Sequence, residues 1–400
     1  MPPRTADVAI VGAGLVGLAT AHALATTHRL RVVVLEKDAH VAPHQSSHNS
    51  GVIHSGLYYT PGSARARLCT DGRVRMVDFC RAHGIAHDVC GKLVVATRDD
   101  ELPRLESLRA RGRENGLDVR AVDPHEMRAI EPHVGGLGAL FVPEAGIADY
   151  PGVARALAAE IAGAGGAVEC RAAFVSAREE GREVVVRVSD GEWRVGALAA
   201  CAGLQSDRVA RACGVTSDIV IAPFRGEYYQ LTPARQSLVR NLIYPVPDPR
   251  FPFLGVHFTR MALGGVEAGP NAVMALAREG YKWGDVSIGD MADALGSRGV
   301  RRFVRRHLGT GIAEIRRSFS KARFTATLQR LIPSLTAADL APGGAGVRAM
   351  ALTPQGTMVD DFAFVDTGRM THVLNAPSPA ATASLAIGDH VATRVLARLT

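Results

Sequence analysis

Asp7-Val-Ala-Ile-Val-Gly-Ala-Gly-Leu-Val-Gly17 joins a β-prone apolar run to three glycines at the spacing Gly-x-Gly-x-x-Gly. The segment from Leu18 to Thr26 has helical character, and a second β-prone run, Leu30 to Leu35, ends at Glu36, 19 residues after Gly17. This order of strand, glycine turn, helix, strand and acid predicts a βαβ unit that binds a dinucleotide.

Each residue of this motif has an expected physical task. Gly12 makes the tight turn, Gly14 lets the backbone approach the pyrophosphate, and Gly17 lets the helix pack on the strand. The N–H groups at the start of the helix face the phosphates. Glu36 accepts hydrogen bonds from a ribose 2′-hydroxyl and repels a 2′-phosphate, which favours FAD or NAD over NADP. We expect Lys37 to contact the cofactor as well.

The composition indicates a large α/β protein. A chain of 400 residues with 47% hydrophobic residues and 42 glycines is long enough for two domains. Its six cysteines have no metal-type spacing, and we expect reduced thiols in a cytoplasmic protein. No apolar run reaches the ~18 residues that span a bilayer, and no targeting segment is expected before the first strand.

The positive charge is concentrated in one segment. Residues 298–330 contain ten Lys or Arg and one acid, Glu314, so the rest of the chain has 36 basic and 38 acidic residues. This segment is either a solvated helical face or a patch that contacts an anionic membrane or an acidic partner, which would place the protein at the inner face of the cell membrane. No nucleic-acid-binding motif accompanies the charge, so nucleic acid is not expected as a partner.

The order of elements predicts an α/β fold, in which a discontinuous Rossmann-like FAD-binding domain holds an inserted antiparallel-sheet substrate domain. The ends of the chain have α/β character, whereas the middle consists of short β-prone runs broken by prolines. We expect residues 1–85, 145–220 and 335–400 in the first domain and 86–144 and 221–334 in the second. The active site should lie where they meet.

A single dinucleotide motif favours FAD, because an enzyme that passes electrons from NAD(P)H to flavin on two such domains usually carries two. The segment from Gln45 to Tyr59 follows the Glu36 strand, and its small residues allow the backbone to approach a flat ring. We expect flavin contacts from five of its residues: Ser46, Asn49, Ser50, Gly51 and Val52.

Further motifs along most of the chain resemble those of the FAD-dependent L-2-hydroxyglutarate dehydrogenases and oxidases, within the broader D-amino-acid-oxidase-like or glycerol-3-phosphate-dehydrogenase-like flavoproteins. They are Ser46–Ser63, Gly146–Tyr150, Cys201–Asp207, Pro223–Tyr229, Leu242–His257, Gly269–Val273, Gly346–Arg348, Asp360–Phe362 and Asn375–Gly388. The proline-rich run inside Leu242–His257 is far more specific than a glycine motif.

The resemblance implies oxidation of an L-2-hydroxy acid to a 2-keto acid, with hydride transfer to flavin N5 and a histidine base. His54, in the segment beside the flavin, resembles the catalytic histidine of the glycerol-3-phosphate relatives, and His257 is the other candidate base. A structural hydrogen bond is the alternative role for each. The electrons would pass to a quinone, an electron-transfer protein or O₂.

A dicarboxylate substrate needs cationic donors, and the arginine fork matches a carboxylate. We expect Arg225 and Arg348 to bind it, assisted by Tyr228 and Tyr229. The alternative role for Arg225 is an ion pair with Glu227.

Two further segments are expected to reach the cofactor. Ala202 and Gly203 form a second close approach, and a loop before the last helix, with Pro379, Ala380, Ala381 and Thr382, stabilises negative charge on the flavin. No metal site is expected.

The chain departs from the family at Met350, where a glutamine is common. A related L-2-hydroxy acid therefore stays open as the substrate. A flavin amine or amino-acid oxidase of the same fold, and a non-catalytic peripheral membrane flavoprotein, are the alternatives.

Overall fold

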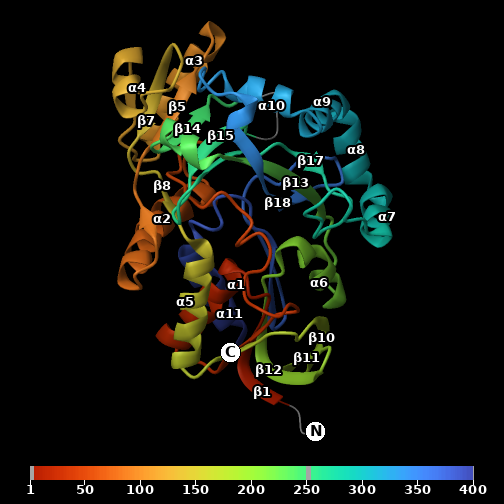
Figure 1. Cartoon of the computed structure of the whole chain (residues 1–400). Coiled ribbons are helices and arrows are strands. Elements are labelled where there is room, and N and C mark those ends of the chain that lie inside the picture. Colours follow the sequence, from red (N-terminus) through yellow and green to blue (C-terminus); the bar gives the residue numbers. More distant parts are fainter. Residues whose placement is uncertain (1–3, 249–253, 400) are drawn as a thin grey trace.

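The computed structural model describes residues 4–248 and 254–399, so part of the Leu242–His257 motif lies outside the described residues. Two large sheets lie at opposite ends of the molecule, and the N-terminal strand belongs to one of them (Figure 1). This architecture confirms the predicted α/β fold with a second, mainly antiparallel sheet.

The first sheet is built around β1 (Arg4–Val11), which pairs in parallel with β2 and β12. Its last four residues are buried because a parallel strand is covered on both faces. The other strands are β2 (Val32–Leu35), β9 (Ala167–Glu169), β10 (Phe174–Glu180), β11 (Glu183–Val188), β12 (Gly191–Ala200), β19 (Ala363–Thr367) and β20 (Met370–Asn375). A hairpin of β10 and β11 continues the sheet beyond the first half of β12.

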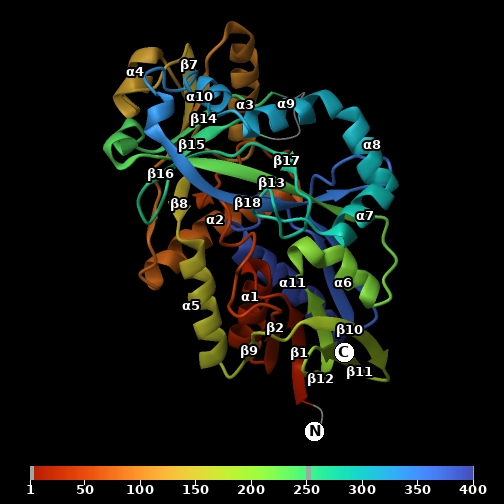
Figure 2. The ribbon, with the colours of Figure 1, turned by 45° about the vertical axis from the view of Figure 1, so that its right-hand side comes forward.

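Three helices cover one face of this sheet: α1 (Leu15–His22), α5 (Tyr150–Gly163) and α11 (Ser384–Leu399). The first and last helices of the chain pack together, as Figures 1 and 2 show. A short π-helix (Ala23–Thr27) extends α1, and α6 (Ser206–Ala212) packs near β20. The N- and C-terminal segments therefore form one hydrophobic core.

The second sheet is mainly antiparallel and has one parallel pair, β5 with β14. In chain order its strands are β5 (Lys92–Ala96), β6 (Arg120–Val122), β7 (Gly138–Val142), β13 (Val220–Leu231), β14 (Leu242–Pro245), β15 (His257–Arg260), β16 (Val266–Gly269), β17 (Val273–Met274) and β18 (Leu340–Leu352). Short 3₁₀ turns lie at Asp99–Glu101, Gly203–Gln205, Pro233–Leu238 and Ala337–Asp339.

Helices surround the second sheet, and three of them, α7 to α9, follow its outer edge in Figure 2. They are α3 (Leu102–Glu114), α4 (Pro124–Ile130), α7 (Ile288–Gly296), α8 (Arg298–Arg306), α9 (Leu308–Ser318) and α10 (Lys321–Leu328). Helix α2 (Ala64–Ala82) instead packs against α11. A small third sheet of β3 (Val52–Ile53), β4 (His87–Asp88) and β8 (Gly146–Ala148) connects the two halves.

One strand departs from the division of the chain expected at residue 335. β18 pairs in antiparallel fashion along the whole length of β13, so residues 340–352 lie in the second sheet instead of with the FAD-binding segments. The physical reason is that β13 needs hydrogen-bonding partners along both edges, and β18 supplies one of them.

Candidate active site

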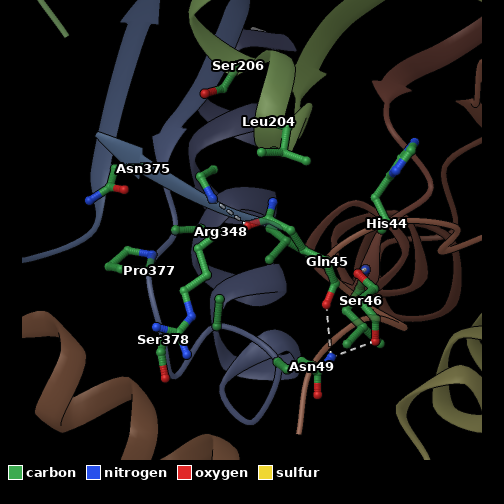
Figure 3. Close-up of a pocket in the computed structure, with 18 of the residues that line it drawn as sticks. His44, Gln45, Ser46, Asn49, Leu204, Ser206, Arg348, Asn375, Pro377 and Ser378 are labelled. Atoms are coloured by element: carbon green, nitrogen blue, oxygen red, sulfur yellow. Dashed lines mark hydrogen bonds between the residues drawn. The ribbon is translucent and has the colours of Figure 1, made fainter. Parts of the chain in front are cut away.

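A large cavity, of about 990 Å³, lies between the two sheets. One end is formed by the turn between β1 and α1, at Gly12 and Gly14, and the other by the inner face of the second sheet, at Tyr228 and His257. Figure 3 shows its middle part, where the loop around Gln45, the side chain of Arg348 and the loop around Ser378 meet.

The glycine turn has no room for side chains. Gly12 has a φ of +100°, and a Cβ there would lie 2.6 Å from the carbonyl oxygen of Cys201. A Cβ on Gly17 would lie 2.0 Å from the carbonyl oxygen of Gly12, so the helix packs directly on the turn. Gly14 is the N-cap of α1 and lines the cavity, whereas Gly17 does not. The structure thus shows the tight turn at Gly12 and the close helix packing at Gly17 that the spacing predicts.

Glu36 is fixed at the end of β2. Its carboxylate accepts hydrogen bonds from the backbone N–H of Ala13 at 2.8 Å and of Asp38 at 3.0 Å. The side chain is 6% exposed and lines the cavity, so its remaining lone pairs can receive a diol. Lys37 also lines the cavity, where its ammonium binds Asp38 and Glu279.

The loop that follows β2 folds back over the start of α1. The side chain of Asn49 donates to the carbonyl oxygens of Gln45 and Ser46, both at 2.9 Å, as Figure 3 shows. Ser46 Oγ accepts a hydrogen bond from the backbone N–H of Leu15 at 3.0 Å. Gln45, which the sequence interpretation did not single out, ties this loop to β18 by accepting from the backbone N–H of Ala349.

Most of the expected cofactor contacts line the cavity. The residues that do so are Gly12, Gly14, Glu36, Lys37, Ser46, Asn49, Ser50, Val52, Ala202, Gly203, Pro379, Ala380 and Ala381. Gly51 and Thr382 are not among the residues that line the cavity. Thr382 is fully buried, and its hydroxyl donates to the carbonyl oxygen of Val52 and accepts from the backbone N–H of His54. Thr382 therefore ties the backbone of residues 52–54 to the loop before α11.

The imidazole of His54 faces the loop before α11, with Nε2 3.2 Å from Ser378 Oγ. Burial, together with the positive charge of Lys92, lowers the pKa of His54 to about 3. This side chain is therefore neutral at pH 7 and able to accept a proton.

His257 begins β15 at the other side of the cavity. Its Nδ1 lies 2.8 Å from the carbonyl oxygen of Gly255, and since a carbonyl only accepts, Nδ1 carries the proton and Nε2 keeps its lone pair. The ring stacks on Tyr244 at a centroid distance of 3.9 Å. Burial lowers the pKa of His257 to about 3, with a smaller effect from Arg348. The cavity thus contains two neutral imidazoles.

A cation lies beside them. Arg348, from β18, lines the cavity and hydrogen-bonds with the hydroxyl of Tyr228 from β13. In Figure 3 the side chain of Arg348 extends toward Ser378, in the loop that contacts His54. Met350 lines the same wall.

The structure does not bring Arg225 and Tyr229 to the cavity. Arg225 is 1% exposed and donates to the carbonyl oxygen of Lys282 at 2.8 Å, and it forms an ion pair with Glu227 at 3.2 Å. Tyr229 packs on Phe324 with a ring-centroid distance of 4.8 Å. The cause is strand alternation: residues 225, 227 and 229 of β13 point to one face, whereas 226 and 228 point to the cavity.

Three further residues, at the inner end of the cavity, were not expected from the sequence. Tyr58 and Tyr244 line the cavity, and Lys92 lies against both of their rings. The signal for Tyr244 was its place in the proline-rich motif, but its direction depends on the pairing of β14 with β5.

Arg65 connects two segments at this end of the cavity. It lines the cavity while it donates to the backbone carbonyl oxygen of Ser378 and binds Asp360. It therefore fixes α2 to the loop that precedes α11.

Among the described residues, no group of three or more His, Cys, Asp or Glu side chains could hold a metal ion. The six cysteines are all free thiols in this structure.

These features define a dinucleotide-binding oxidoreductase with a polar pocket at the inner end. The family model for FAD dependent oxidoreductases matches residues 7–394, and the chain belongs to this family. The chain is 45% identical over 393 residues to L-2-hydroxyglutarate dehydrogenase of Salmonella houtenae, covering 98% of this chain and 93% of that one. It is 42% identical to the mitochondrial L-2-hydroxyglutarate dehydrogenase of Homo sapiens, covering 98% of this chain and 89% of that one.

Solved structures share the fold at low sequence identity. L-alpha-glycerophosphate oxidase from Mycoplasma pneumoniae, solved with FAD bound, has a TM-score of 0.79 at 21% identity, covering 98% of this chain and 95% of that one. Glycine oxidase from Geobacillus kaustophilus has a TM-score of 0.74 at 18% identity, covering 99% and 96%.

The residues present fit FAD. Close backbone packing at Gly12 and Gly17, the buried carboxylate of Glu36 and the start of α1 form one end of the cavity. The cavity then continues past Ala202 and Gly203 to the loop at Pro379–Ala381, which gives an extended dinucleotide room to lie along it.

Proposed function

We propose that this FAD-dependent enzyme oxidises L-2-hydroxyglutarate, or a close L-2-hydroxy acid, to the corresponding 2-keto acid. The observation that carries this proposal is identity of 42–46% over nearly the whole chain to L-2-hydroxyglutarate dehydrogenases from bacteria and animals. The cavity agrees with it, because a cation and two neutral imidazoles lie at one end.

The residues at the inner end have distinct roles in this proposal. Arg348 and Tyr228 bind a carboxylate of the substrate through charge-assisted hydrogen bonds. His54 or His257 takes the proton of the substrate hydroxyl, and the negative charge of a bound substrate raises the proton affinity of either imidazole. Bound FAD would supply the acceptor for the hydride that leaves the carbon bearing the hydroxyl.

Anaerobic reduction of the purified flavoprotein tests this function. We expect L-2-hydroxyglutarate to bleach the flavin absorbance, and D-2-hydroxyglutarate, glycine and L-proline to leave it unchanged. Bleaching by an amine but by none of the L-2-hydroxy acids would replace the proposal with an amine or amino-acid oxidase. L-malate and L-lactate in the same panel show which chain length of the acid the enzyme accepts. Met350 lines the cavity, so its side chain can affect this preference.

A membrane quinone is the electron acceptor that we propose for this enzyme. Support comes from α8 and α9, where the expected basic segment displays an exposed apolar row at one-turn spacing. Its members are Val304, Leu308, Ile312, Ile315 and Phe319, which are 37–68% exposed. Exposed arginines flank the row at 301, 302, 305 and 316. This combination fits an anionic bilayer surface, with apolar side chains in the interface and arginines at the headgroups.

No helix among the described residues has the length and apolar character needed to cross a bilayer, so the proposed contact is a surface contact. Co-sedimentation with vesicles tests it. We expect binding to vesicles rich in phosphatidylglycerol, release at high salt, and no binding to phosphatidylcholine alone. Leu308→Asp should abolish binding, whereas Val74→Asp, at an equally exposed apolar site on α2, should not. Equal binding of both variants would exclude the apolar row as the contact.

Reoxidation distinguishes the acceptors. The reduced enzyme should transfer electrons to a soluble quinone analogue faster than to O₂. Faster reoxidation by O₂ would define an oxidase.

A further inference from the structure

Lys92 is a buried cation beside the inner end of the cavity. It is the first residue of β5 and is 1% exposed. Its ammonium lies 4.5 Å from the ring centroid of Tyr58 and 4.9 Å from that of Tyr244. Among the described residues no carboxylate forms an ion pair with it. Because a buried charge is costly without a countercharge, this arrangement indicates a function beyond packing.

The choice of lysine is itself informative. The chain has four lysines, at positions 37, 92, 282 and 321, against 42 arginines among its 46 basic residues. Arginine is the ordinary cation of this protein, yet a lysine stands at the buried position. Lysine provides a compact charge that can lose its proton, whereas a guanidinium stays charged at all relevant pH values.

The two tyrosines connect Lys92 to the reacting groups. Both line the cavity, and Tyr244 stacks on His257. The hydroxyl of Tyr58 is buried and has no hydrogen-bond partner among the described residues, so it is available to a ligand. The electrostatic influence of Lys92 reaches both His54 and His257.

We propose that Lys92, held against the rings of Tyr58 and Tyr244, is a positioning residue that draws the anionic substrate to the inner end of the cavity and adds to the positive potential around His54 and His257. This inference rests on the proposed function and adds the source of the positive potential at the base of the site. Lys92 acts through the tyrosine rings, while Arg348 makes the direct contact with a carboxylate.

The groups around Lys92 come from several elements. They are His54 and Tyr58 from the loop after β3, Arg65 and Cys69 from α2, Tyr244 from β14, His257 from β15 and Arg348 from β18. Burial lowers the pKa of Lys92 to about 8. The positive charge is thus present at neutral pH and lost as the pH rises above that value.

Two variants separate the charge from the packing. Lys92→Met keeps an apolar stem of similar length without the charge, and Lys92→Arg keeps the charge at high pH. Lys321→Met is the matched control, since Lys321 lies on α10 and donates to the carbonyl oxygen of Leu340 outside the cavity. The FAD content and thermal midpoint of each holoenzyme establish that it is folded.

The first measurement is the dissociation constant of glutarate, a dicarboxylate without a hydroxyl, followed through the flavin spectrum. We expect Lys92→Met to raise it by roughly 10-fold or more, as for the loss of one nearby charge at an effective dielectric constant of ~20. Lys92→Arg should bind nearly as tightly as the native enzyme. An unchanged dissociation constant in Lys92→Met would overturn the inference.

The second measurement is the pH profile of kcat/KM. The native enzyme should lose activity as the pH rises above about 8, because Lys92 becomes neutral. In Lys92→Arg this descending limb should disappear, and in Lys92→Met the ascending limb should move up by roughly one pH unit because the imidazoles gain protons more easily. Identical profiles for all three proteins would also overturn the inference.

These outcomes are separable from failure of the proposed function. If no L-2-hydroxy acid reduces the flavin of the native enzyme, the proposed function fails. If the native enzyme is reduced and the Lys92 variants match it in glutarate binding and pH profile, only the role of Lys92 fails. If Lys92→Met does not fold, the high-pH limb of Lys92→Arg still decides.

Discussion

The two ends of the cavity are built in different ways. At the β1–α1 turn, the cavity is formed by backbone atoms and the carboxylate of Glu36, within the segment from Gly12 to Glu36. At the inner end, side chains from five separated segments converge, from His54 to Ser378. The first end is local in sequence and the second is assembled by strand pairing. Variants at the two ends should therefore fail differently, by losing the cofactor at one and by losing turnover at the other.

The largest effect should come from the imidazole that acts as the base. Replacing it with asparagine in His54→Asn or His257→Asn should lower the rate of anaerobic flavin reduction by roughly 10²–10⁴-fold while FAD stays bound. Rapid mixing with the substrate measures this rate, and His125→Asn, at an exposed site on α4, is the control. Full rates in both cavity variants would remove histidine base catalysis from the proposed mechanism.

Substitutions in the glycine turn between β1 and α1 should lower the stability of the protein. Gly17→Ala places a methyl group 2.0 Å from the carbonyl oxygen of Gly12, which requires a backbone shift. We expect loss of FAD and a fall of about 3 kcal/mol or more in the free energy of unfolding. Gly163→Ala, where a Cβ meets no atom within 4 Å, should change stability by less than about 0.5 kcal/mol. Denaturant titration and flavin content check both, and a stable, yellow Gly17→Ala protein would contradict the close packing.

Arg348 and Arg225 allow a comparison between an arginine that lines the cavity and one that lies outside it. Arg348→Met should raise the KM for the hydroxy acid by roughly 10- to 100-fold, because a charge-assisted hydrogen bond to the substrate is lost. Arg225→Met should leave KM unchanged and lower the thermal midpoint, since Arg225 packs on Trp283 and Glu227 away from the cavity. Steady-state kinetics and thermal unfolding separate the two. The reverse pattern would place Arg225 at the substrate.

The smallest effect concerns acid stability. Burial lowers the folded-state pKa of both His54 and His257 from 6.5 to about 3. Above pH 6.5 neither state takes up these protons, so this contribution to stability is fully present there. Below that pH the unfolded chain takes up protons that the folded protein does not, so stability decreases as the pH falls toward the folded-state pKa values.

A double variant, with asparagine at both histidine positions, isolates this contribution. Its free energy of unfolding should decline less steeply between pH 6.5 and about 4 than that of the native protein. Urea titrations at several pH values measure the slopes, to which the carboxylates contribute equally in the two proteins. Equal slopes would mean that both imidazoles are solvated in the folded state.

The same contrast explains what could be predicted for the candidate site. The glycines, Glu36 and the loop at Ser46–Val52 were predictable because each contact lies within a short stretch of chain. For the second sheet, the sequence correctly indicated antiparallel strands but not their faces. Tyr228 and Tyr229 are adjacent and chemically identical, and only Tyr228 reaches the cavity. Register decides between them, and a shift of one residue would exchange the two.

The sequence by itself determined the βαβ unit, the glycine turn between its first strand and helix, and the basic character of residues 298–330, because local spacing and composition suffice for these features. The tertiary structure alone decided that Arg225 lies outside the cavity that Arg348 lines, that Lys92 lies against two tyrosine rings, and that an apolar row on α8 and α9 faces outward. The physical reason is that the direction of a side chain depends on strand register and helix packing, which residues far apart in the chain fix together.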